Sequence, residues 1–102
     1  MMQTIYFTIT ATNFFFGMDF FKPDMVVILE KEPTNPHDRE AILVKMSGLG
    51  AVGYVANSTH TVLGESMSAG RLYDKIGDTA TGIVRYVLPQ GVVCELIDEK
   101  EA

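Results

Sequence analysis

The sequence predicts a mainly β protein, folded as a small closed or nearly closed barrel of about six strands with one short helix. The first observation behind this is a series of short segments that are rich in β-branched and aromatic residues and alternate in polarity. The second is the frequency of Gly, Pro and Asn between these segments, which marks turns. Closure would also pair the edge strands of a chain in which 47% of the residues are hydrophobic.

Six segments have the strand pattern: residues 3–11, 25–32, 41–46, 51–55, 79–88 and 92–97. Residues 33–38, Pro-Thr-Asn-Pro-His-Asp, are predicted to form a loop, because two prolines remove backbone donors and Asn and Asp favour turns. Residues 47–50 and 89–91 are the predicted hairpin turns. Gly48, Gly50 and Gly53 join strands and are expected to be turn glycines.

Residues 57–69 are predicted to form the helix, with Gly70 as its C-terminal stop. Three side chains at its start can cap the N-terminus, namely Asn57, Ser58 and Thr59. An apolar stripe would face the barrel through Val62, Leu63 and Met67. Gly64 weakens this helix.

The length suits one domain, residues 1–102, with residues 98–102 as a short charged tail that is expected to fray. The only cysteine, Cys94, cannot form an internal disulfide, which suits a reducing cytoplasm, and its apolar strand suggests a small buried side chain. The N-terminal stretch lacks the leading positive charge of a secretory signal, and no apolar run approaches the roughly 20 residues that cross a bilayer. We therefore expect a soluble, cytoplasmic protein without a membrane partner.

The net charge limits the functions that are open to this domain. Thirteen acidic and eight basic residues give a net charge of −5. Non-specific duplex binding depends on Lys and Arg displacing counterions from phosphates, so the bulk charge counts against it. Net charge says little about a local patch, and any nucleic-acid role must therefore rest on particular residues.

Residues 29–44 read LEKEPTNPHDREAILV, which is a strand, a charged residue before Pro, then Asn-Pro-His-Asp and a second apolar run. Residues 51–55 follow as Ala-Val-Gly-Tyr-Val after a strand and a turn. In order and spacing these two blocks resemble the HIRAN family, whose loop reads Asn-Pro-aromatic-Asp. The similarity extends weakly over residues 5–96. It implies an OB-like or SH3-like barrel that binds DNA and, because relatives are fused to fork-remodelling helicases or nucleases, a place in DNA repair.

The resemblance also implies a site for the 3′ end of a single DNA strand. In DNA-binding members the loop Asp accepts a hydrogen bond from the terminal 3′-hydroxyl, and aromatic side chains stack on the end bases. Carried over by position, Asp38 is the implied acceptor, Asn35 shapes or lines the pocket, and His37 replaces the usual Tyr. The implied aromatic contacts are Tyr54 and the run Phe14, Phe15 and Phe16.

The chain departs from the family pattern where phosphate contacts are expected. An Arg beside the aromatic pair is missing, and residues 13–21 carry no positive charge. Ala56 and Asn57 stand where the family often has Pro and a basic residue. Lys22 and Arg39 flank the aromatic run and the loop, and they are the remaining phosphate candidates. We therefore expect modest affinity, about micromolar or weaker.

Each of these assignments has a structural alternative. Asp38 is equally well placed to hold the turn through a bond to its own backbone. Phenylalanines are more often core residues, which applies here to residues 14–16, 20 and 21. Because a strand cannot bury three consecutive side chains on one face, at least one of Phe14, Phe15 and Phe16 is expected in a pocket, at the surface or in a subunit interface.

The main alternative function is a protein-interaction module on the same barrel that has lost DNA binding, with a protein partner or a second copy as its ligand. The acidic charge and the phenylalanine run favour it. Catalysis is not expected, since no nucleophile, base or metal cluster is recognisable. His37, His60 and Cys94 lack the paired spacing of a zinc site, so no metal or cofactor is expected.

Overall fold

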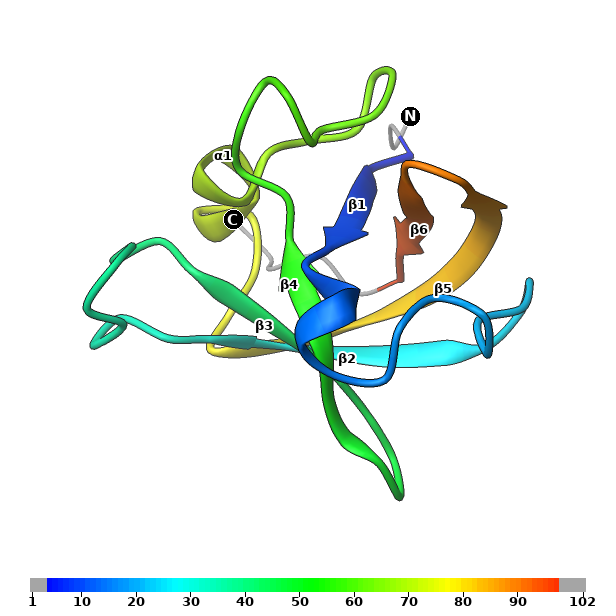
Figure 1. Cartoon of the computed structure of the whole chain (residues 1–102). Helices are drawn as coiled ribbons and strands as arrows, with labels where there is room; N and C mark the ends of the chain where they lie inside the picture. The colour runs from blue at the N-terminus through cyan, green and yellow to red at the C-terminus, as the bar shows by residue number, and fades with distance from the viewer. Residues whose placement is uncertain (1–3, 98–102) are drawn as a thin grey trace.

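In a computed structural model, which describes residues 4–97, six antiparallel strands form a closed barrel in the order β1-β4-β3-β2-β5-β6 (Figure 1). The strands are β1 (Tyr6–Thr10), β2 (Val26–Lys31), β3 (Ile42–Met46), β4 (Gly50–Val55), β5 (Thr79–Leu88) and β6 (Gly91–Leu96). A 3-10 turn, η1 (Thr12–Phe14), follows β1, and the short helix α1 (Ala69–Tyr73) precedes β5. The predicted barrel is confirmed, whereas Gln3 and residues 98–102 lie outside the described residues.

Alternate residues of every strand fill the interior of the barrel. Phe7 and Ile9 of β1, Leu29 of β2, Val44 of β3 and Val84 of β5 are all fully buried. This period of two is the pattern that the sequence showed. Strands β2 to β6 begin and end within one residue of their predicted bounds, whereas β1 begins at Tyr6, later than the predicted start at residue 3. Cys94 is also fully buried, and its burial raises the pKa of its thiol to about 12.

The predicted helix over residues 57–69 is wrong. The segment consists of turns and irregular backbone, and α1 begins where that helix was expected to end, so that Gly70 lies inside α1. β1 pairs with β4 only at Ile9 and Thr10, and the irregular segment lies against the remainder of β1: the Met67 amide donates to the Tyr6 carbonyl at 2.7 Å. The hydrogen bond to the part of β1 that β4 leaves unpaired therefore outweighs the weak helical pattern of this segment.

The glycines between β3 and β4 have two different roles. Gly48, with a φ value of +86°, lies in the turn as predicted. Gly50, with a φ value of +81°, follows the turn as the first residue of β4. Gly53, in contrast, lies inside β4, and the turn assignment for it is wrong. A Cβ at this position would lie 2.7 Å from Ile9 Cγ2 and 2.8 Å from the Thr10 carbonyl oxygen. The absence of a side chain therefore lets β1 approach β4 closely.

The phenylalanines divide between core and surface. Phe21 is buried and Phe20 partly buried, as expected of core residues, whereas Phe14, Phe15 and Phe16 are 79%, 36% and 57% exposed. The core assignment is wrong for these three because they do not lie on a strand. The Thr12 carbonyl accepts hydrogen bonds from the amides of Phe15 and Gly17, so the chain turns around a buried Thr12 and the rings point outward.

Within residues 4–97, no helix is long and apolar enough to cross a membrane.

Candidate nucleic-acid interface

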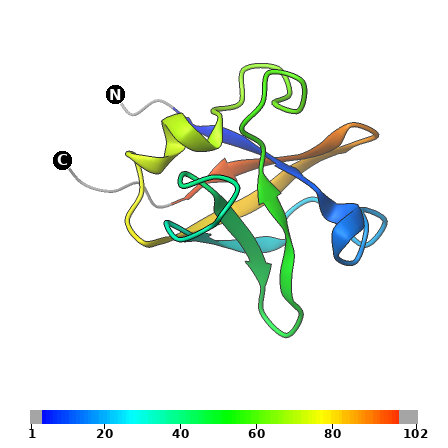
Figure 2. The ribbon, with the colours of Figure 1, turned by 60° about the vertical axis from the view of Figure 1, so that its left-hand side comes forward.

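The loop between β2 and β3 projects from the barrel at the left of Figure 1 and lies beside α1 in Figure 2. Asn35 organises it, because its side-chain oxygen accepts hydrogen bonds from the amides of His37 and Asp38 at 2.9 and 3.2 Å. Such bonds make an Asn side chain the centre of a tight turn. An open hollow of about 640 Å³ runs along this loop and is lined by the seven residues from Pro33 to Arg39.

The Asp38 carboxylate has both a structural role and unused hydrogen-bonding capacity. Its Oδ1 accepts from the Glu40 amide at 2.9 Å, and its Oδ2 accepts from Asn57 Nδ2 at 3.1 Å. A carboxylate offers about four acceptor positions, so these two bonds leave about two for a ligand. Asp38 is half-buried and is one of the residues that line the hollow.

Glu32 connects this loop to β4. Its Oε1 accepts a hydrogen bond from the Tyr54 hydroxyl at 2.7 Å and another from Asn35 Nδ2 at 3.0 Å. The bond to Glu32 raises the pKa of Tyr54, and burial and the negative charge of Glu32 raise it further, while a bond with Asn35 opposes them. One carboxylate oxygen thus joins the turn residue Asn35 to the aromatic ring of Tyr54.

The aromatic part of the site lies next to this connection. The ring of Phe15 packs against that of Tyr54, with centroids 6.1 Å apart and planes tilted by 47°. Phe14 and Phe16 lie on the same turn and are more exposed than Phe15. A ring that is exposed and held by a neighbour is suited to stack on a base. Tyr54 does not line the hollow itself and reaches it through Glu32 and Asn35.

The charges around the loop are mainly negative. Glu32, Asp38 and Glu40 contribute carboxylates, and Arg39 contributes a guanidinium that is exposed to solvent. Lys22 lies before β2, whereas the loop follows β2, so a strand of six residues, roughly 20 Å long, separates them. The structure therefore brings Arg39, but not Lys22, to the predicted acceptor.

The chain was compared with known protein families and with solved structures. The model of the HIRAN domain matches residues 2–93. The chain belongs to the HIRAN domain family. Among solved structures, the crystal structure of the HIRAN domain of human HLTF is similar, with a TM-score of 0.60 and 16% sequence identity over 91% of this chain and 74% of that chain. At this identity the likeness shows the shared fold. No curated protein sequence matches the chain.

HIRAN domains are known as DNA-binding modules, so membership supports nucleic-acid binding as the general class of function. Of the predicted site residues, the fold brings Asn35, His37, Asp38 and Arg39 together on one loop. Tyr54 is linked to that loop through Glu32, and Phe15 packs against Tyr54 from the turn that also carries Phe14 and Phe16. Across residues 4–97 no three His, Cys, Asp or Glu side chains are grouped to hold a metal ion.

Two residues of this candidate site, Glu32 and Asn57, were not among those predicted from the sequence. Glu32 stands directly before Pro33 in the motif, and that position was a signal that a charged group belongs there. Asn57 was assigned to a helix cap, whereas it bridges Asp38 to α1: its Oδ1 accepts from the Gly70 amide at 2.8 Å. Its contact with Asp38 spans 19 positions of the chain, so no local pattern shows it.

Proposed function

We propose that this HIRAN domain binds the 3′ end of a single DNA strand, with Asp38 accepting a hydrogen bond from the terminal hydroxyl. The observation that supports this most is the position of Asp38 on the hollow with acceptor capacity to spare. A terminal hydroxyl is a donor, which an internal phosphodiester lacks, so an acceptor distinguishes the end of a strand from its middle.

In this proposal the end base stacks on the Phe15 and Tyr54 rings, and Arg39 contacts a phosphate. The negative charge of Glu32, Asp38 and Glu40 opposes a long run of phosphates along the loop, so contact is limited to the last nucleotides. Affinity is about micromolar or weaker, because few cations are available. The role in DNA repair and the cytoplasmic location suggested by the sequence stay predictions.

The test is fluorescence anisotropy with short oligothymidylates labelled at the 5′ end and carrying either a 3′-hydroxyl or a 3′-phosphate. We expect the phosphate to weaken binding by about tenfold or more, because it removes the donor and places an anion against a carboxylate. Asp38→Ala should remove this discrimination. Equal affinity of the unmodified domain for both ends contradicts the proposal.

Asn57→Ala is the matched control for the structural role of Asp38. It removes the bond to Asp38 Oδ2 but leaves the carboxylate in place. Asn57→Ala should therefore lower stability without abolishing the preference for a hydroxyl end. If both variants lose the preference to the same degree, Asp38 acts only by holding the loop.

A protein partner, or a second copy of the chain, is the second candidate, and the acidic surroundings of the loop favour it. Exposed Phe14 and Phe16 would supply the apolar contacts of such an interface. Salt dependence separates the two functions. DNA binding weakens as salt rises because counterions are released on binding. Sedimentation that shows a dimer, lost in Phe14→Ala, together with no oligonucleotide binding would favour the second candidate.

A further inference from the structure

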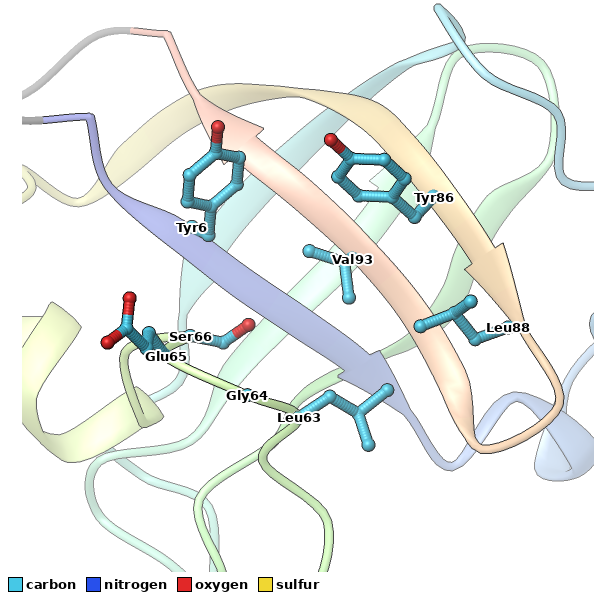
Figure 3. A pocket seen from close by; sticks show the side chains of 8 residues that line it. All are labelled: Tyr6, Leu63, Gly64, Glu65, Ser66, Tyr86, Leu88 and Val93. Atoms are coloured by element: carbon cyan, nitrogen blue, oxygen red, sulfur yellow. The ribbon is translucent and has the colours of Figure 1, made fainter.

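A second hollow lies on the outer face of β1, β6 and β5 (Figure 3). Its volume is about 320 Å³, and it is lined by Tyr6, Leu63, Gly64, Glu65, Ser66, Tyr86, Leu88 and Val93, which we call the tyrosine groove. In the strand order of the barrel, β5 stands opposite β4 and β6 opposite β3. The groove is therefore separate from the loop and from Tyr54, which lie on the β3 and β4 side.

An irregularity in the β5–β6 ladder forms one wall of this groove. Val84 pairs with Cys94, but the next pair is Tyr86 with Val93, so β5 contains one extra residue at Arg85. In a regular strand Tyr86 would point inward like Val84, and the extra residue turns it outward. Tyr86 is 58% exposed, and Figure 3 shows its ring standing on the same face as Tyr6 with Val93 between them.

The opposite wall is held in place by hydrogen bonds rather than left loose. The Leu63 amide donates to Thr8 Oγ1 at 3.2 Å, and the Ser66 amide donates to the Leu63 carbonyl at 3.1 Å. Thr8 and Ser66 are buried. Because these bonds hold the loop wall without a ligand, binding in the groove does not have to order this loop.

The chemistry of the groove selects the class of ligand. Leu63, Leu88 and Val93 make it largely apolar, and its volume accommodates one or two side chains. Its only charged group is Glu65, which takes part in none of the ion pairs among residues 4–97. Among the residues that line the groove a phosphate would meet a carboxylate and no cation, whereas a Lys or Arg next to an apolar side chain would complement both features.

Two cations lie nearby but outside the groove. Arg71 and Lys75 share a neighbouring hollow with Glu65, on the side of α1. They are not within ion-pair distance of Glu65, so they leave its carboxylate available. They also provide a matched test, since changing Glu65 alters the groove whereas changing Arg71 alters only its surroundings.

We propose that the tyrosine groove binds a segment of a partner protein in which an aliphatic or aromatic side chain stands next to a Lys or Arg. The apolar side chain lies between Tyr6 and Tyr86 over Val93, and the cation pairs with Glu65. This gives the domain a protein-binding face on the side of the barrel away from the loop. The inference does not depend on whether the loop binds DNA.

The test is selection of displayed random peptides on the whole chain, with peptides that also bind the Tyr86→Ala variant removed. We expect enrichment of peptides that combine an apolar or aromatic residue with a neighbouring Lys or Arg. An enriched peptide should lose about tenfold or more in affinity on Glu65→Lys and on Leu88→Ser, and about twofold or less on Arg71→Gln. All four positions are at or near the surface, and circular dichroism should confirm that each variant is folded.

Four results would overturn the proposal. The first is no enrichment over the Tyr86→Ala variant, and the second is enrichment of peptides without a basic residue. The third comes from amide shifts in a nuclear magnetic resonance titration. Shifts at residues 63–66 and 86–88 on addition of a short oligothymidylate would assign the groove to nucleic acid. Self-association lost in Tyr86→Ala would assign it to a second copy of the chain.

Discussion

The loop of residues 33–39 and the tyrosine groove are two hollows on opposite sides of one barrel, and they are built differently. Side-chain hydrogen bonds shape the loop, in which Asn35, Asp38 and Glu32 each accept two. Strand register shapes the groove, through the extra residue of β5 and a wall that is fastened largely by backbone amides. One surface is polar and acidic, and the other is largely apolar with one charge.

This difference explains why only one of the two surfaces can be recognised in the sequence. A turn held by side-chain bonds requires particular residue types at fixed positions, because few side chains can accept from backbone amides two or three positions on, as Asn35 and Asp38 do. A groove made by register requires only apolar residues on the outward face of its strands. It therefore leaves no motif, although it is as well defined in space.

The largest effect is expected for Gly53→Ala. This variant tests whether the side of the barrel that carries Tyr54 and the loop of residues 33–39 depends on the close approach of β1 to β4. The new Cβ would stand 2.8 Å from a backbone oxygen of Thr10, so strands must separate. We expect a loss of about 3 kcal/mol in the free energy of unfolding, measured by urea denaturation. Gly77→Ala is the control, since its Cβ would meet nothing closer than 3.8 Å and should change stability by less than about 1 kcal/mol. Equal losses in the two variants would show that the contact at Gly53 relaxes freely.

A smaller effect is expected for Glu32→Ala, which separates the loop from Tyr54. Loss of the two bonds to Glu32 Oε1 should lower the free energy of unfolding by about 1–2 kcal/mol. Glu32→Gln keeps an acceptor oxygen and should lose less. In Glu32→Ala the pKa of Tyr54 should fall toward its ordinary value of 10.0, because the bond and the negative charge that raise it are gone. In Glu32→Gln the pKa should fall less, because the negative charge is lost but an acceptor for the Tyr54 hydroxyl is kept.

Titration of the phenol absorbance measures this change. Because the folded-state pKa of Tyr54 is raised, its contribution to stability is complete below the ordinary value and is lost as the pH rises through the raised one. The variants should therefore lose less stability than the unmodified domain when the pH increases in that range. An unchanged Tyr54 titration in Glu32→Ala would mean that the bond contributes nothing in solution.

Much of the fold was predictable because it depends on local patterns. Alternation along the strands and the turn residues between them predicted six strands, and the barrel follows from their number and length. Gly53 and residues 57–69 were misassigned for a common reason. A glycine is required at position 53 because Ile9 lies close to it, and the irregular segment is held by the hydrogen bond from Met67 to Tyr6. Both contacts join residues that are far apart in the chain.

The candidate site was predictable only where the family motif covers it. The motif placed Asn35, His37 and Asp38 on one loop, and the structure adds that they line a hollow. It said nothing of Asn57 as the partner of Asp38 or of Glu32 as the partner of Tyr54, because these pairs depend on how the strands close. Lys22 was grouped with the loop by sequence order alone, and β2 separates them.

The proposed stacking of the end base on Phe15 and Tyr54 can be tested by comparing Phe15→Ala with Phe14→Ala. Phe15 packs against Tyr54, whereas Phe14 is 79% exposed and has no ring partner among the described residues. If the end base stacks on the supported ring, Phe15→Ala should weaken binding of a 3′-hydroxyl oligothymidylate by about 1 kcal/mol, roughly fivefold. Phe14→Ala should change it by less than twofold, and anisotropy titration measures both. The reverse order would place the base on the outer part of the turn.

The smallest effect is expected for Arg39→Gln, compared with Lys22→Gln. Arg39 lies on the hollow beside Asp38, and Lys22 lies at the far end of β2. One phosphate contact to a single strand contributes about 0.7 to the slope of log affinity against log salt. Arg39→Gln should reduce the slope by about this amount, and Lys22→Gln should leave it unchanged. A reduction in both variants would mean that the strand runs along the barrel to Lys22, so that the loop binds the interior of a strand as well as its end.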